Sequence, residues 1–105
     1  MNTEKILSEL INSDGVSGDE KSFNLKVSEI LKETAGYDSY FNGNNLIADI
    51  GERTDGRTHV LVDAHSDEIG MICAYIDDDG FIVPGNIGGM DYRILPAQRV
   101  TVHGR

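Results

Sequence analysis

Apolar residues recur at helical spacing in the first third of the chain. One predicted helix carries its apolar face on Ile6, Leu7, Leu10 and Ile11. A turn-rich stretch, NSDGVSG, then interrupts the pattern. Ser17 and Glu20 have the spacing of a capping box, which predicts that a second helix starts there. That helix should end at Gly36, because glycine readily adopts the left-handed conformation that closes helices.

Short apolar runs separated by turn residues follow Gly36 and predict strands. Residues 77–80, DDDG, separate two of these runs and predict the turn of a hairpin. Together with the helices, the runs predict an α/β fold with two helices packed on a sheet. The predicted strands are YDSYF, NLIADI, THVLVDAH, IGMICAYI, GFIVP and RVTVHG, at residues 37–41, 45–50, 58–65, 69–76, 80–84 and 99–104.

Composition and charge narrow the class of protein. The 105 residues, 39% hydrophobic and 26% charged, suit one small globular domain or a piece of a larger one. A net charge of -9 argues against nucleic acid or an anionic membrane as partner. The N-terminus lacks the basic and apolar regions of a signal peptide, which predicts a cytoplasmic protein. Cys73, the single cysteine, is predicted to be a small buried side chain of its apolar run.

Candidate chemistry lies in residues 62–70, VDAHSDEIG. The apolar run before it predicts a strand buried on both faces, and sites in open α/β sheets lie at the carboxyl ends of strands. Strand alternation puts Asp63, His65 and Asp67 on one face and directs Glu68 away. His65 is therefore a candidate ligand of a divalent metal, supported by a carboxylate. A histidine hydrogen-bonded to a carboxylate without any ligand fits the same spacing.

Two longer stretches carry a resemblance to a known family. AHSDEIGMICAYIDDDGFI and NIGGMDYRILPAQRVTVHGR contain A-H-x-D-E-x-G, an apolar strand, an acidic glycine turn, G-G, and a Q-R-V strand ending near H-G. Ser17, Gly18 and Glu20 match an S-G-x-E element at the second helix. In these features the chain resembles the M42 family of metal-dependent aminopeptidases, of the glutamyl and deblocking type. Phe41 and Asn44 depart from it, standing where relatives often have Asp and Gly before a strand.

The resemblance implies roles for the residues that match. His65 corresponds to the family's first metal ligand, and Asp67 to the catalytic-site acid held close to it. Glu68 is the family's usual next residue, without an assigned role. The bridging aspartate, the general-base glutamate and the later ligands of the family have no counterpart up to residue 105. The chain is therefore expected to be an N-terminal portion that is inactive alone.

The architecture and chemistry of the family follow as further expectations. Residues 1–68 would form part of an α/β zinc-peptidase domain, and residues 69–105 would begin an inserted antiparallel β-barrel used in assembly. Relatives form dodecamers and remove N-terminal residues from short peptides. They use two divalent metal ions, for which zinc, cobalt or manganese suits the ligand types.

These residues also allow other functions to be considered from their spacing, and three alternatives differ in the groups that they require. A calcium loop aligned on Gly80 would put Tyr75 at the first ligand position, so an acidic turn explains that stretch better. A glycoside hydrolase needs two facing carboxyl groups, whereas Asp67 and Glu68 would diverge on a strand. Two alternatives stay open. One is a binding or assembly module without enzymatic activity, which titration with zinc or cobalt would distinguish from a metal site, and the more distant one is a glycoside hydrolase, which hydrolysis of a glucan without peptide turnover would favour.

Overall fold

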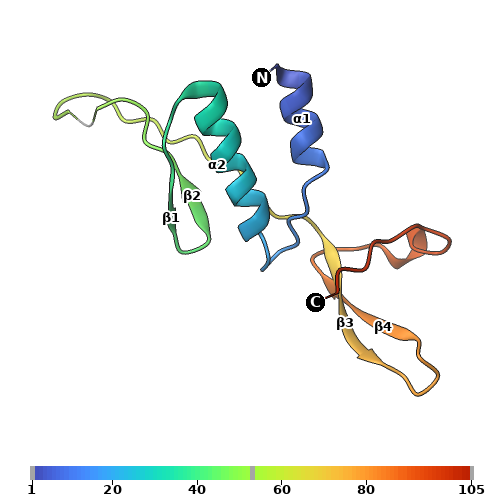
Figure 1. The fold of residues 1–105 in the computed structure, drawn as a ribbon. Helices are drawn as coiled ribbons and strands as arrows, with labels where there is room; N and C mark the ends of the chain where they lie inside the picture. Colours follow the sequence, from blue (N-terminus) through green and yellow to red (C-terminus); the bar gives the residue numbers. More distant parts are fainter. Residues whose placement is uncertain (1, 53, 105) are drawn as a thin grey trace. The chain divides into compact units, whose positions relative to one another are not determined.

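The computed structural model describes residues 2–52 and 54–104, which form two compact units (Figure 1). The first unit ends at Glu68 and holds two α-helices and a hairpin. The second begins at Ile69 and holds another hairpin and a short 3-10 helix. The elements are α1 (Thr3–Ile11), α2 (Lys21–Ala35), β1 (Tyr40–Asn42), β2 (Asn45–Ile47), β3 (Gly70–Ile76), β4 (Ile82–Ile87) and η1 (Tyr92–Ile94).

Helix α1 confirms the helix expected from the first apolar pattern. The side chain of Asn2 accepts a hydrogen bond from the backbone N–H of Lys5 at 2.9 Å, which satisfies one of the unpaired donors of the first turn. Asn12 follows the last turn, and its N–H donates to the carbonyl oxygen of Ser8. No helix among the residues that the structure describes is long and apolar enough to cross a lipid bilayer.

Helix α2 is confirmed, but the predicted capping box at its start is wrong. The helix begins at Lys21, and Glu20 precedes it without a capping side-chain hydrogen bond. The carboxylate of Glu20 instead accepts the N–H of Gly18 at 2.6 Å, and the hydroxyl of Ser17 has a partner far away in the chain. The end agrees with the prediction, since Gly36 has φ 75° and donates its N–H to the carbonyl of Lys32.

Helix α2 is the centre of the first unit. Ile30 and Asn24 are the buried residues of this helix, at 7% and 5% exposure. The amide of Asn24 donates to the carbonyl of Asn44 at 3.0 Å, which joins α2 to the antiparallel hairpin of β1 and β2. On the other side, the ammonium of Lys26 lies 3.2 Å from the carboxylate of Glu9 on α1. Of the expected two helices on a sheet, α2 alone contacts β structure among the described elements, through β2 of a two-stranded sheet, while α1 contacts α2.

The second unit confirms the predicted hairpin. Strands β3 and β4 pair antiparallel, with an irregular register between Cys73 and Tyr75. At the turn, the N–H of Gly80 donates to the carbonyl of Asp77 at 3.0 Å, and the N–H of Asp77 donates to the carbonyl of Phe81. The carboxylate of Asp77 also accepts the N–H groups of Asp79 and Phe81. The acidic turn therefore has a structural explanation.

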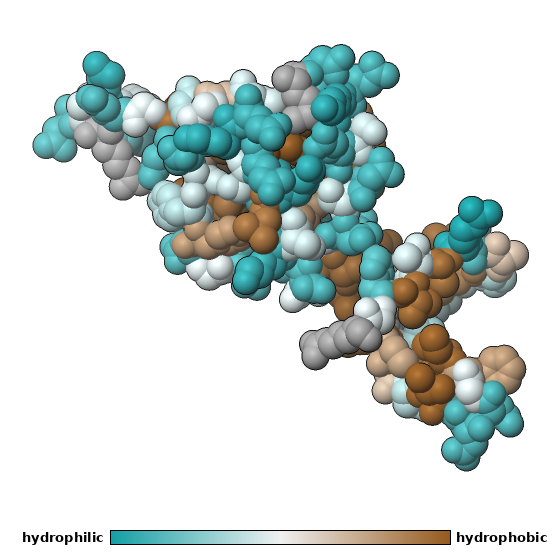
Figure 2. Space-filling view, in the orientation of Figure 1, coloured by the Kyte–Doolittle hydropathy of each residue, from teal (hydrophilic) through white to brown (hydrophobic). Residues whose placement is uncertain are grey.

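Two predicted strands and one predicted buried residue are wrong. Residues 58–65 and 99–104 form no strand in the structure. The apolar run at residues 60–62 is 82% to 90% exposed, because no described strand pairs with it and no layer covers it. Cys73 is also exposed, since the two-stranded sheet that carries it has no covering layer. The described residues contain no closed barrel, and Figure 2 shows apolar surface over the second hairpin.

Candidate functional site

The candidate site lies where two distant segments of the first unit meet. Val16 and Glu68 form an isolated parallel β-bridge. The N–H of Glu68 donates to the carbonyl of Gly15 at 2.7 Å, and the N–H of Ser17 donates to the carbonyl of Glu68 at 3.2 Å. These backbone bonds align the loop before α2 with the end of the VDAHSDE segment.

Gly15 makes this close approach possible. A Cβ atom at Gly15 would lie 3.0 Å from the carbonyl oxygen of Ser66 and 3.2 Å from the Cβ of Phe23. Both distances are tighter than ordinary van der Waals contact. The residue must therefore lack a side chain for the two segments to lie against each other in this way.

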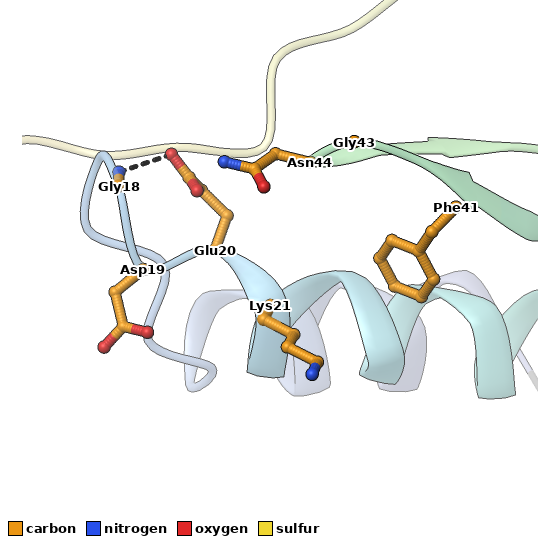
Figure 3. A pocket seen from close by; sticks show the side chains of 7 residues that line it. All are labelled: Gly18, Asp19, Glu20, Lys21, Phe41, Gly43 and Asn44. Carbon is orange, nitrogen blue, oxygen red and sulfur yellow. Dashed lines mark hydrogen bonds between the residues drawn. The ribbon is translucent and has the colours of Figure 1, made fainter.

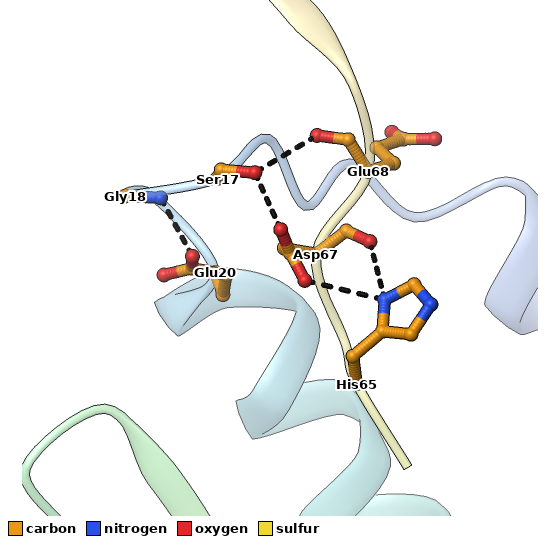
Figure 4. Close-up of polar contacts among 6 residues, drawn as sticks. All are labelled: Ser17, Gly18, Glu20, His65, Asp67 and Glu68. Carbon is orange, nitrogen blue, oxygen red and sulfur yellow. Dashed lines mark hydrogen bonds and ion pairs between the residues drawn. The ribbon is translucent and has the colours of Figure 1, made fainter. Parts of the chain in front are cut away.

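Ser17, Asp67 and His65 form one chain of hydrogen bonds (Figure 4). The hydroxyl of Ser17 donates to Oδ2 of Asp67 at 2.5 Å. The other carboxylate oxygen, Oδ1, lies 3.2 Å from Nδ1 of His65, and the carbonyl oxygen of Asp67 lies 3.0 Å from the same nitrogen. The pairing of His65 with Asp67 expected from the sequence is present.

The partners of His65 identify which ring nitrogen carries hydrogen. A backbone carbonyl and a carboxylate can only accept hydrogen bonds, so Nδ1 of His65 is the donor. In the neutral ring, Nε2 then holds the free lone pair. The ring is 86% exposed, and Figure 4 shows its second nitrogen directed away from Asp67. This is the arrangement in which histidine binds a metal through Nε2.

Hydrogen bonding also keeps Asp67 charged. The hydroxyl of Ser17 is the main cause that holds the pKa of Asp67 below its usual value. A backbone N–H bond and the neighbouring His65 act in the same direction, while partial desolvation opposes them. Asp67 is thus an acceptor for both Ser17 and His65 at neutral pH.

The other sequence candidates are placed differently. Asp63 is exposed and belongs to no strand. Glu68 takes part through its backbone, and Figure 4 shows its carboxylate directed away from Asp67. Among residues 2–52 and 54–104, no group of three or more His, Cys, Asp or Glu side chains could hold a metal ion. The atom that could bind a metal is Nε2 of His65, and Asp67 orients the imidazole ring that carries it.

Ser17 is the site residue that sequence reasoning assigned to another role. Its position three residues before a glutamate favoured a helix cap, although its hydroxyl binds Asp67. The resemblance to the S-G-x-E element was the one sequence feature that connected this loop with the family.

A hollow of the first unit lies beside the start of α2, and His65 is not among its lining residues (Figure 3). It has a volume of about 540 Å³ and is lined by residues 18–21 together with Phe41, Gly43 and Asn44. Phe41 and Asn44 are the two positions at which the sequence departs from the resemblance described above. A smaller hollow of about 220 Å³ reaches Ser66 and Glu68.

Comparison with known proteins gives consistent matches. A family model described as M42 glutamyl aminopeptidase matches residues 44–105. A protein of Acetivibrio thermocellus named "Putative aminopeptidase" is 36% identical over 86 residues, covering 82% of this chain and 25% of its own. The "Lysyl aminopeptidase" of Pyrococcus furiosus is 33% identical over 97 residues, which cover 91% of this chain and 27% of the relative.

The chain spans about a quarter of the length of the curated relatives that it matches. No solved structure matches it significantly. The family match covers more than half of the chain and includes His65 and Asp67, and both relatives carry aminopeptidase names. The chain belongs to the M42 family of glutamyl aminopeptidases.

Proposed function

We propose that the complete protein is a metal-dependent aminopeptidase that removes N-terminal residues from short peptides. His65 is the proposed metal ligand and Asp67 the acid that supports it. The observation that carries this proposal is the pair itself, in which Asp67 accepts the Nδ1–H of His65 and leaves Nε2 as the donor atom. Membership of the M42 family and the names of the relatives support the reaction.

In that chemistry, His65 and Asp67 would act in metal binding. Asp67 orients the imidazole and increases its basicity through the hydrogen bond to Nδ1. Two divalent ions, zinc or cobalt, would polarise the scissile carbonyl and lower the pKa of the attacking water. His65 would hold one of them, with further ligands from outside the described residues. Removal of a water proton by a general base belongs to the same reaction type.

The two compact units support a proposal about domains. Residues 1–68 would belong to the peptidase domain, and residues 69–105 would begin an antiparallel barrel domain that serves assembly. The hairpin of β3 and β4 and its exposed apolar residues are consistent with a role in a larger sheet or interface. A homo-oligomeric complete protein follows from this proposal.

The test compares two histidine variants of the complete protein. After loading with zinc, cobalt or manganese, the wild type is assayed with a panel of amino-acid amides and short peptides. His65→Ala is expected to lose activity and bound metal, because it removes a ligand. His59→Ala is the matched control, since His59 is an exposed histidine six positions earlier, and it should retain both.

Normal turnover and metal content in His65→Ala would contradict the metal-ligand role. Absence of metal binding and peptide turnover in the wild type would instead favour a binding or assembly module. Hydrolysis of a glucan without peptide turnover would favour a glycoside hydrolase.

A further inference from the structure

We propose that Ser17 is a positioning residue of the candidate metal site. Its hydroxyl fixes the Asp67 carboxylate, and the carboxylate in turn fixes the ring of His65. The inference rests on the proposed function of His65 as a metal ligand. It extends that function to a loop that is 50 positions away in the chain.

The geometry gives each carboxylate oxygen of Asp67 a separate partner, and the backbone carbonyl of Asp67 is a second acceptor for Nδ1 of His65 at 3.0 Å. Oδ2 accepts the hydroxyl of Ser17 at 2.5 Å, and Oδ1 lies 3.2 Å from Nδ1 of His65. The terminal torsion of an aspartate is otherwise broad, so a carboxylate held only by the histidine could rotate out of its plane of contact. Ser17 removes that freedom, because rotation would break the hydrogen bond to Oδ2.

The hydroxyl of Ser17 has no competing role in helix α2. The helix begins at Lys21, and the loop N–H of Gly18 is satisfied by the carboxylate of Glu20. The hydroxyl also lies 3.4 Å from the carbonyl of Glu68, a longer contact than the one to Asp67. Its main energetic effect is therefore on the acid beside the histidine.

The backbone holds Ser17 in place without help from its side chain. The N–H of Ser17 donates to the carbonyl of Glu68, and the N–H of Glu68 donates to the carbonyl of Gly15. An alanine at position 17 keeps both bonds. Ser17→Ala should consequently test the hydroxyl alone.

The first readout is the tautomer of His65 in the metal-free complete protein, measured by nitrogen NMR of the imidazole ring. The wild type should carry hydrogen on Nδ1. Ser17→Ala should lower the population of the Nδ1–H tautomer, and the carbonyl of Asp67 should retain part of it. Ser17→Thr keeps a hydroxyl and should preserve the wild-type tautomer. Ser17→Val introduces a side chain of the same size as threonine without the hydroxyl, and it should behave like Ser17→Ala.

The second readout is the zinc dissociation constant, measured by competition with a chelator. Loss of a residue that supports a metal ligand from the outer shell typically weakens binding about 10- to 100-fold, and Ser17→Ala is expected near the lower bound. Ser17→Thr should restore most of the affinity. Ser22→Ala is the matched control, since its hydroxyl donates to the backbone carbonyl of Asp14 at 3.5 Å, and it should bind zinc as the wild type does.

These readouts separate the two proposals. A wild type that binds no zinc contradicts the proposed function, while the tautomer series still decides the role of Ser17. An Nε2–H tautomer in the wild type, or the same tautomer and zinc affinity in Ser17→Val and Ser17→Thr, overturns the positioning role. A hydroxyl-dependent tautomer supports it.

Discussion

Gly15 and Asp91 show how single residues shape the two units. Gly15 lets the loop before α2 lie against the backbone of Ser66. Asp91 accepts the N–H of Arg93 at 3.0 Å, which begins the turn of η1, and also receives the guanidinium of Arg93 through Nε and Nη2. In both cases one residue determines whether a local arrangement can form. Each therefore supports a prediction at the scale of the residue.

Gly15→Ala should loosen the contact on which the candidate site is built. The added Cβ would meet the Ser66 carbonyl at 3.0 Å, and overpacking of this kind typically costs about 1–3 kcal/mol. Hydrogen exchange of the Glu68 amide, which donates to Gly15, should accelerate at least about fivefold in the complete protein. Gly89→Ala is the control, because a Cβ there would meet nothing within 4 Å. Equal exchange rates in wild type and Gly15→Ala would refute the prediction.

The pH dependence of the turn at η1 follows from Asp91. The guanidinium of Arg93, and then its backbone N–H, hold the pKa of Asp91 below its usual value. A carboxylate with a lowered pKa stabilises the folded turn above the unfolded pKa of about 3.9. That contribution is lost as pH falls through the lower folded value.

Arg93→Gln should raise the titration midpoint of Asp91 toward the usual range, because it removes the charged donor and keeps the backbone N–H. Carbonyl-carbon NMR of the Asp91 side chain in the complete protein measures this midpoint. Arg57→Gln, in the other unit, should leave the midpoint unchanged. An unchanged midpoint in Arg93→Gln would contradict the assignment.

At the scale of the element, the hairpin of β3 and β4 is specified by its turn. The N–H of Gly80 donates to the carbonyl of Asp77, three residues earlier. Gly80 itself adopts the left-handed conformation, with φ 87°. Such a turn matches the twist of the strands that it connects. The carboxylate of Asp77 adds two bonds to backbone N–H groups. The element is therefore defined by its local sequence.

Gly80→Ala should destabilise this hairpin by about 1–2 kcal/mol, because a Cβ is disfavoured in the left-handed region. Gly80→Asn should cost less, since asparagine tolerates that region better. Hydrogen exchange of the Asp77 amide, which donates across the turn, reports the difference in the complete protein. The prediction is wrong if alanine and asparagine accelerate exchange equally.

At the scale of the whole molecule, apolar surface remains exposed on both units. Among the residues that the structure describes, Ile30 is the buried hydrophobic one, while Leu61, Ile72 and Phe81 are 58% to 89% exposed. Exposed apolar groups and unpaired strand edges favour association. The isolated chain therefore differs from a self-sufficient globular domain.

The 105-residue chain, studied alone, is expected to self-associate. Its exposed apolar side chains would be removed from water by contact with other copies. Sedimentation of the purified chain across micromolar concentrations measures this, beside the variant Leu61→Lys, which should reduce association. A stable monomer at every concentration would contradict the expectation.

The same chain should lack aminopeptidase activity. A catalytic zinc usually has three protein ligands, and His65, in its proposed role with Asp67 behind it, would provide one ligand atom. The purified chain is incubated with excess zinc or cobalt and amino-acid amides, beside His65→Ala. Turnover that depends on both the metal and His65 would show that this ligand count is wrong.

Local sequence patterns were sufficient to predict the elements that depend on neighbours in the chain. The apolar spacing and Gly36 located the two helices, and the acidic turn before Gly80 located the second hairpin. The approach of His65 and Asp67 was also predictable, because two positions of separation suffice for the contact. These features need only local hydrogen bonds and backbone preferences.

Features that depend on distant partners could not be predicted from local patterns. The strand expected at residues 58–65 does not form, and Cys73 is exposed, because strand pairing and burial require segments that local patterns do not specify. Ser17 has the sequence signature of a cap, yet its hydroxyl binds Asp67. The backbone bridge between Val16 and Glu68 brings the acid within reach of this hydroxyl, and a contact between positions 50 residues apart leaves no local pattern in the sequence.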